Sequence, residues 1–155
     1  MKKLLLALLF LPLTAVAQTK EETQAWILSK VPYVSYLNYT IDGENLIATF
    51  PPMRSGGNTI KRTLALQGIK NISYTHTDKY LSFVLKCDTE CAYLIETDSS
   101  DKFVSESKKD MMLFELYGKV DADIGPRMEK ALLRLVELSG GKAKAVPYQK
   151  KKEAF

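Results

Sequence analysis

The sequence predicts an α+β domain in which helices cover an antiparallel sheet. Between residues 33 and 117, short runs alternate apolar and polar side chains, a pattern typical of strands with one buried face. One long segment with helical periodicity follows and ends at Gly140-Gly141. A shorter segment with a helix-start signal precedes the strands at about residues 20–30. A helix, a series of strands and a second helix are therefore the predicted order of elements.

Residues 1–17 have the features of a secretory signal peptide. Two lysines form a positive start, residues 4–16 form an apolar run, and Ala15 and Ala17 place small residues where a signal peptidase reads them. The run is shorter than the roughly 20 apolar residues that span a bilayer. No cysteine stands at the cleavage point, so no lipid anchor is expected. The sequence thus predicts export to the periplasm or the extracellular space, with no stable membrane insertion after cleavage.

The remaining chain divides into a single globular domain, residues 18–141, and a basic tail, residues 142–155. The tail is rich in lysine and lacks periodicity, which predicts that it is largely disordered. The chain holds 22 basic and 18 acidic residues, and removal of the signal peptide takes away two lysines. No basic stripe remains outside the tail, so we expect no nucleic-acid partner.

Both predicted helices carry start signals. The first begins with a capping box, in which the Thr19 hydroxyl accepts a hydrogen bond from the Glu22 amide and the Glu22 side chain reaches back. Asp121 or Asp123 is the expected cap of the second helix. Its apolar residues recur at intervals of three and four and form one stripe for packing on the sheet: Ile124, Met128, Ala131, Leu132, Leu135 and Leu138.

About seven strands are predicted, in one bent sheet or a partly open barrel, near residues 35–41, 45–50, 59–66, 69–76, 80–87, 91–96 and 111–117. The clearest inward face belongs to Leu81, Phe83 and Leu85. Arg62 has the parity of an apolar face, so we expect it near a strand end, where its charge reaches water. Residues 98–110 are polar and predict a mobile connection with room for a short strand.

Cys87 and Cys91 are predicted to form a structural disulfide. A three-residue turn brings such positions within bonding distance, and the compartment reached by export is oxidising. A redox-active pair usually has two intervening residues, and a metal site needs more ligands than the sequence offers. His76 is the single histidine and stands at a predicted strand end. We therefore predict no catalytic residue, no cofactor and no metal.

The order of elements over residues 35–140 resembles that of the pleckstrin-homology-like fold, in which a bent sheet is plugged by a C-terminal helix. The two ends of the mature chain resemble those of small exported bacterial proteins of unknown function. The similar stretches are Thr-Lys-Glu-Glu-Thr-x-x-Trp-Ile at 19–27 and Lys-Ala-Leu-x-x-Leu-x-x-Leu-x-Gly-Gly-Lys-Ala-Lys at 130–144. Neither resemblance implies an activity, because a fold does not carry a function. A lipocalin-like meander and a simple sheet covered by two helices are alternative architectures.

The favoured function is non-enzymatic binding of a protein or peptide in the cell envelope. This follows from the lack of a catalytic constellation and from a tyrosine-rich segment that holds Tyr33, Tyr36 and Tyr39. Tyrosine buries area and keeps a polar end, so these three side chains predict a partner surface. Packing within the sheet is the alternative role for them. The sequence determines neither the partner nor an oligomeric state.

Two other functions are compatible with the sequence. A carrier of a small apolar ligand would need a cavity of at least about 300 Å³ inside the barrel, lined by residues such as Phe50, Phe83 and Phe114. A carboxylate-dependent hydrolase would use Asp98, Asp101 and Asp110, the clustered acidic candidates. The hydrolase is the least favoured function, because nothing in the sequence fixes the geometry of these aspartates.

Overall fold

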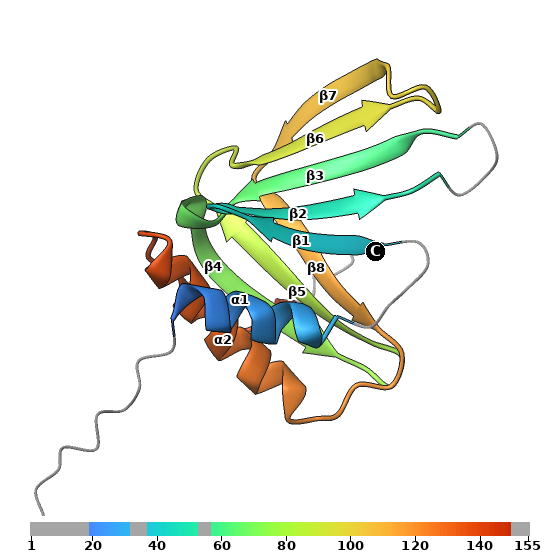
Figure 1. The fold of residues 1–155 in the computed structure, drawn as a ribbon. Coiled ribbons are helices and arrows are strands. Elements are labelled where there is room, and N and C mark those ends of the chain that lie inside the picture. The colour runs from blue at the N-terminus through green and yellow to red at the C-terminus, as the bar shows by residue number, and fades with distance from the viewer. Residues whose placement is uncertain (1–18, 32–36, 53–56, 150–155) are drawn as a thin grey trace, which may run out of the picture.

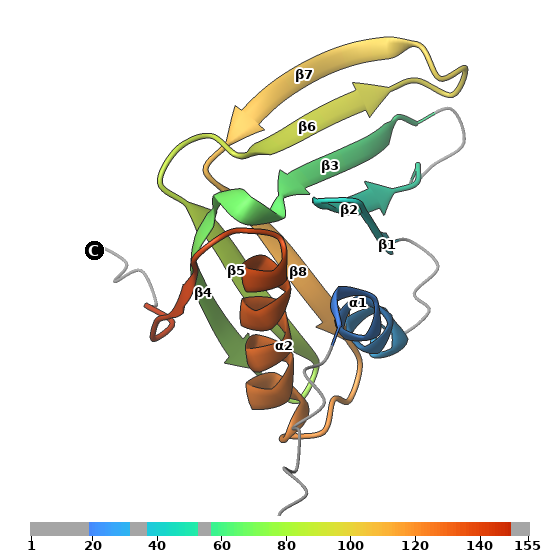
Figure 2. The ribbon, with the colours of Figure 1, turned by 60° about the vertical axis from the view of Figure 1, so that its left-hand side comes forward.

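The computed structural model describes residues 19–31, 37–52 and 57–149, which form an α+β structure with two helices and two sheets. The predicted signal peptide, Tyr33 and Tyr36 lie outside the described residues. Figures 1 and 2 show two layers of strands, with both helices beside the four-stranded layer. The predicted fold class is confirmed at this level.

The first sheet has five antiparallel strands. In spatial order they are β1 (Asn38–Asp42), β2 (Asn45–Phe50), β3 (Thr59–Ala65), β6 (Ala92–Thr97) and β7 (Phe103–Lys109). The second sheet holds β8 (Met111–Tyr117), β5 (Tyr80–Cys87), β4 (Ile69–His76) and β9 (Lys144–Ala145). The sheets are separate and do not close into a barrel, so the predicted bent sheet or partly open barrel is replaced by two sheets.

Two strands lie outside the seven predicted ranges. β7 falls in the stretch expected to be a mobile connection, because nearly all of its side chains are exposed and it lacks an alternating apolar pattern. β9 falls in the tail expected to be disordered, and it pairs in parallel with β4. The Val146 amide extends this contact by donating to the carbonyl of Ile72 at 2.9 Å. Backbone hydrogen bonds therefore hold this part of the tail in the fold.

α1 (Lys20–Ser29) begins with the predicted capping box. The Glu22 amide donates to the Thr19 hydroxyl at 3.1 Å, and the Thr19 amide donates to the Glu22 carboxylate at 3.0 Å. Ile27 is fully buried, and the Trp26 ring centroid is 5.7 Å from the Lys30 ammonium and 5.4 Å from the Arg127 guanidinium. The helix therefore packs chiefly against α2 and also touches β1.

α2 (Ile124–Leu138) covers one face of the four-stranded sheet. Met128, Leu132 and Leu135 of the predicted stripe are buried, and the helix lies against β4. Asp123 occupies the cap position, but its side chain makes no capping hydrogen bond. Its carboxylate accepts a hydrogen bond from Arg127 at 3.1 Å instead, which corrects the expected role of this aspartate. Gly140, with φ at +80°, follows the helix end as predicted.

Candidate functional site

The two sheets are joined at one corner, where the chain crosses between them three times. The crossings are η1 (Leu66–Gly68) between β3 and β4, residues 88–91 between β5 and β6, and Asp110 between β7 and β8. Away from this corner the sheets diverge, and the hairpin of β6 and β7 extends beyond the second sheet (Figure 2). The corner therefore fixes where β8 starts relative to β3 and β6.

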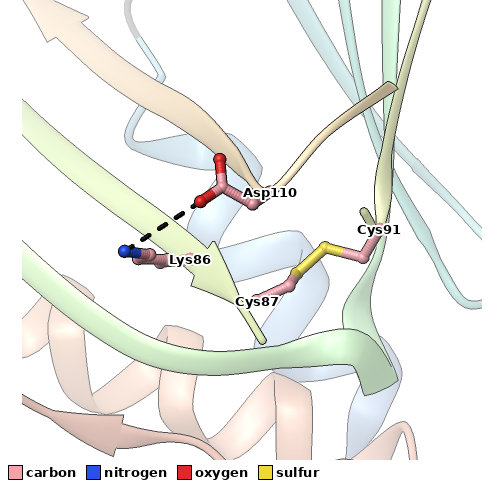
Figure 3. Close-up of a disulfide and its surroundings, with 4 residues drawn as sticks. All are labelled: Lys86, Cys87, Cys91 and Asp110. Atoms are coloured by element: carbon pink, nitrogen blue, oxygen red, sulfur yellow. Dashed lines mark ion pairs between the residues drawn. A yellow bond between two sulfur atoms is a disulfide. The ribbon is translucent and has the colours of Figure 1, made fainter. Parts of the chain in front are cut away.

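The predicted disulfide lies at this corner (Figure 3). Cys87 and Cys91 are bonded, with their Cα atoms 6.2 Å apart, and both are buried. The prediction of a disulfide is thus confirmed, and the three-residue turn that it spans connects strands of different sheets, β5 and β6. The Cys87 amide also donates to the carbonyl of Asp110 at 2.8 Å, which ties the third crossing to the second.

A groove of about 300 Å³ opens beside this corner, between the inward face of the first sheet and the start of β8. Its walls are Arg62 of β3, residues 92–94 of β6, Lys109 of β7 and residues 111–113 of β8. Two larger hollows, of about 440 and 400 Å³, adjoin residues 142–144 and are lined largely by charged side chains. The groove combines mainly apolar walls with two cations, so it is the better candidate for a binding site.

The backbone of β8 lines the groove with an unpaired edge. The Asp110 carbonyl faces β5, because it accepts the amide of Cys87, whereas the Glu115 amide faces away and donates to the Tyr39 hydroxyl at 2.9 Å. Backbone groups alternate in direction along a strand. Met111 and Leu113 share the parity of Glu115, so their N–H and C=O groups point out of the sheet. Among the described residues no strand pairs with this edge.

Arg62 is one of the two cations that line the groove. It lies at the centre of β3, opposite Ala48 and Leu94, and not near a strand end as expected. The guanidinium carbon is 4.6 Å from the centroid of the Phe50 ring, and Nε is buried without a hydrogen-bond partner. Within the described part of the chain, Arg62 makes no ion pair.

Glu96 lies in the adjacent cross-strand row on the same face as Arg62, but its carboxylate is hydrogen-bonded to other residues. Glu96 accepts hydrogen bonds from Asn58 at 2.6 Å and from Ser105 at 2.9 Å. The bond from Asn58, supported by that from Ser105, lowers the pKa of the Glu96 carboxyl below its usual value. Glu96 therefore stays ionised without neutralising Arg62.

Tyr39, part of the predicted partner surface, faces the core. Its side chain is 5% exposed, and its ring centroid is 4.6 Å from that of Phe114. Burial raises the pKa of its hydroxyl well above the usual value. Since the hydroxyl accepts a hydrogen bond from Glu115, Tyr39 closes the far end of the free β8 edge and does not contribute to an exposed surface.

The residues named for the alternative functions lie apart from the groove. Phe83 and Phe114 are fully buried and do not line it. Asp98 and Asp101 stand in the turn before β7, and Asp110 follows that strand of seven residues, so about 23 Å separates them along its length. The three carboxylates are therefore not brought together.

His76 is exposed at the end of β4, as predicted, and its Nε2 atom lies 3.1 Å from the carbonyl of Val120. Over the described ranges, no group of three or more His, Cys, Asp or Glu side chains is placed to hold a metal ion. The same ranges contain no helix that is long and apolar enough to span a membrane.

Known protein families, curated proteins and solved structures offer no match to this chain. The site therefore has to be judged on its own geometry. The sequence carried one signal for it, a cation at an inward-facing strand position, but strand parity did not reveal that Arg62 and the edge of β8 would meet.

Proposed function

We propose that the chain is an exported, non-enzymatic module that binds a protein or peptide through the groove and the adjoining β6–β7 hairpin. One observation carries the proposal: four of the five exposed large hydrophobic side chains in the described part of the chain lie on β6, β7 and β8. They are Tyr93, Phe103, Val104 and Met111. Phe103 is 65% exposed and Val104 is 48% exposed, and the two are consecutive residues of one edge strand.

Export is part of this proposal. The predicted signal peptide and the buried disulfide both suit an oxidising compartment outside the cytoplasm. In such a compartment the exposed apolar hairpin would meet envelope or extracellular proteins. The resemblance to pleckstrin-homology-like proteins adds nothing to the function, because a fold does not carry a function and eight strands in two sheets precede α2.

The geometry favours this function over a carrier of an apolar ligand. A carrier needs an enclosed apolar space, whereas the groove follows a strand edge and includes two cations. Phe83 and Phe114, the expected cavity lining, pack on each other with ring centroids 6.2 Å apart. Their side chains fill the space between the layers that the carrier would require.

The test is retention of envelope proteins by the tagged, exported chain after cross-linking in the cell. The double variant F103S/V104S should lose a protein that the wild type retains, because it removes apolar area from the hairpin alone. Y148S is the matched control, since Tyr148 is comparably exposed but lies outside the hairpin. Equal retention by F103S/V104S and wild type, or loss in Y148S alone, would overturn the proposal.

A further inference from the structure

We propose that the groove takes the carboxyl-terminal end of an extended peptide, which adds as a strand to the free edge of β8 and places its terminal carboxylate on Arg62. This inference rests on the proposed function and specifies the chemistry of the partner.

The edge of β8 provides the backbone part of the site. Met111 and Leu113 direct unpaired N–H and C=O groups into the groove, so an incoming strand finds donors and acceptors at the usual repeat of two residues. A strand added here would lie about 4.8 Å from β8 and beneath the inward face of β3 and β6. The apolar side chains of Leu94 and Met112 line this space.

The length of the site favours a chain end over an internal segment. The free edge starts after the Asp110 corner and stops where the Tyr39 hydroxyl takes the Glu115 amide. Residues 111–113 span only about 10 Å, enough for a few peptide residues. An internal segment would have to leave the groove past Tyr39, whereas a terminus can end there.

Arg62 lies toward this closed end. Ala48 of β2 is paired with Tyr39 of β1 on one side and with Arg62 of β3 on the other, so the three residues form one cross-strand row of the first sheet. The charge of Arg62 also acts on the Tyr39 hydroxyl, where it opposes the rise in pKa caused by burial. A carboxylate at the end of an added strand would meet a guanidinium that lacks an ion-pair partner within the described residues, and the pair would form charge-assisted hydrogen bonds.

The acidic side chain beside this end does not compete for Arg62. The carboxylate of Glu115 accepts hydrogen bonds from Ser82 at 3.2 Å and from Tyr117 at 2.8 Å, on the opposite face of the second sheet. With its carboxylate at this end, the peptide would run in the same direction as β8. Lys109 lines the groove beside the Asp110 corner and would attract further negative charge in the peptide.

The inference is tested by measuring peptide binding to the purified exported chain. Two pools of synthetic ten-residue peptides, identical except for a free carboxylate or a carboxamide at the C-terminus, are equilibrated with the protein. Retained peptides are identified by mass spectrometry, and their Kd is measured by fluorescence anisotropy. We expect binders from the free-acid pool, with affinity at least about tenfold weaker after amidation.

Variants and modified peptides locate the site. Arg62→Met should weaken the free acid at least about tenfold and leave the amide unchanged, whereas Lys61→Met, which removes the neighbouring charge on the outer face, should change neither. N-methylation of the peptide backbone should abolish binding at alternate positions only, because successive amides point to opposite sides. Circular dichroism of Arg62→Met establishes that the variant is folded.

The peptide-binding results test the inference, and retention of an envelope protein by the hairpin tests the proposed function. Binding that is insensitive to amidation, to Arg62→Met and to N-methylation would overturn the inference, although hairpin-dependent retention of an envelope protein would keep the proposed function. Absence of any binder from either pool would also overturn the inference. Loss of hairpin-dependent retention would overturn the proposed function itself.

Discussion

Arg62 and Glu96 occupy adjacent cross-strand rows on the inward face of the first sheet, but they differ in their hydrogen-bond partners. Glu96 has two hydrogen-bond donors, Asn58 and Ser105, that stabilise its ionised form. Arg62 has an aromatic ring under its guanidinium and a buried Nε without a partner. At the residue scale, the Glu96 carboxylate is satisfied within the fold, whereas the buried Nε of Arg62 has no hydrogen-bond partner among the described residues.

Replacing Arg62 with methionine should therefore stabilise the protein while weakening peptide binding. Methionine keeps an unbranched stem on Phe50 and removes a buried donor, so the free energy of unfolding should rise by about 1 kcal/mol. Urea unfolding followed by circular dichroism measures the change. Lys61→Met is the control and should stay within about 0.5 kcal/mol of wild type. A loss of stability in Arg62→Met would mean that the guanidinium supports the fold through Phe50.

Glu96 should contribute to stability in a pH-dependent way. Its pKa is lower in the folded chain than its ordinary value of 4.5, so its contribution is present above that value and is lost as the pH falls through the folded pKa. Glu96→Gln mimics the protonated form. We expect wild type to be the more stable protein at pH 7, and the difference to shrink toward zero below about pH 4.5. A difference that does not change over this range would contradict the assignment.

At the element scale, α2 is positioned by a close contact at its first turn. Gly125 is buried against Tyr74, whose ring in turn lies beside Phe83 at a centroid distance of 5.3 Å. A Cβ atom on Gly125 would lie only 2.8 Å from Cε2 of Tyr74. The missing side chain therefore allows the helix to approach the sheet this closely.

The variant Gly125→Ala has two opposing effects on the free energy of unfolding: a higher helix propensity and a steric overlap with Tyr74. Alanine favours a helix over glycine by about 1 kcal/mol, but the overlap with a packed ring should cost about 1–3 kcal/mol. We expect a net loss in the free energy of unfolding, measured by urea titration. Combining it with Tyr74→Leu should relieve the overlap, so the two effects should not add. Stabilisation by Gly125→Ala in the wild-type background would show that the ring moves freely.

For the whole molecule, the corner of three crossings decides how the sheets face each other. The disulfide joins the end of β5 to the start of β6, and Gly68 allows η1 to pass close by, because a Cβ there would lie 2.9 Å from Cβ of Cys91. Lys86 and Asp110 face each other at 4.0 Å on the outside of this corner, where an exposed pair contributes little (Figure 3). The covalent bond therefore constrains the second crossing, and the backbone hydrogen bond from Cys87 to Asp110 ties that crossing to the third.

Removing the disulfide should destabilise the fold and alter the groove. The bond closes a short loop, with a sequence separation of 4, for which the chain-entropy relation gives about 2 kcal/mol. Cys87→Ala/Cys91→Ala should lose roughly that amount in urea unfolding. Labelling with a thiol reagent should modify the exported wild type only after reduction and denaturation, and labelling without reductant would contradict an intact disulfide.

The elements that follow local rules can be predicted from the sequence. The capping box at Thr19, the apolar stripe of α2, the glycine after its end and the pairing of Cys87 with Cys91 each depend on residues close in the chain. Where β7 lies, the sequence predicted only room for a short strand in a mobile connection, because an edge strand exposed on both faces has no apolar alternation. β9 escaped prediction for a related reason, since its pairing depends on a distant strand and not on its own residues.

The division into two sheets, and the corner where they meet, could not be predicted from the sequence. The alternation of side chains along β3 predicted that Arg62 is on an inward face. Whether other side chains cover that face or a groove remains there depends on the direction in which β8 continues from Asp110. Tyr39 is the opposite case. It belongs to a tyrosine-rich segment that the sequence predicted to be a partner surface, but its side chain is buried in the core and its hydroxyl accepts a hydrogen bond from the Glu115 amide of β8. Local patterns specify which face of an element is apolar, whereas the covering of that face depends on contacts between residues far apart in the chain.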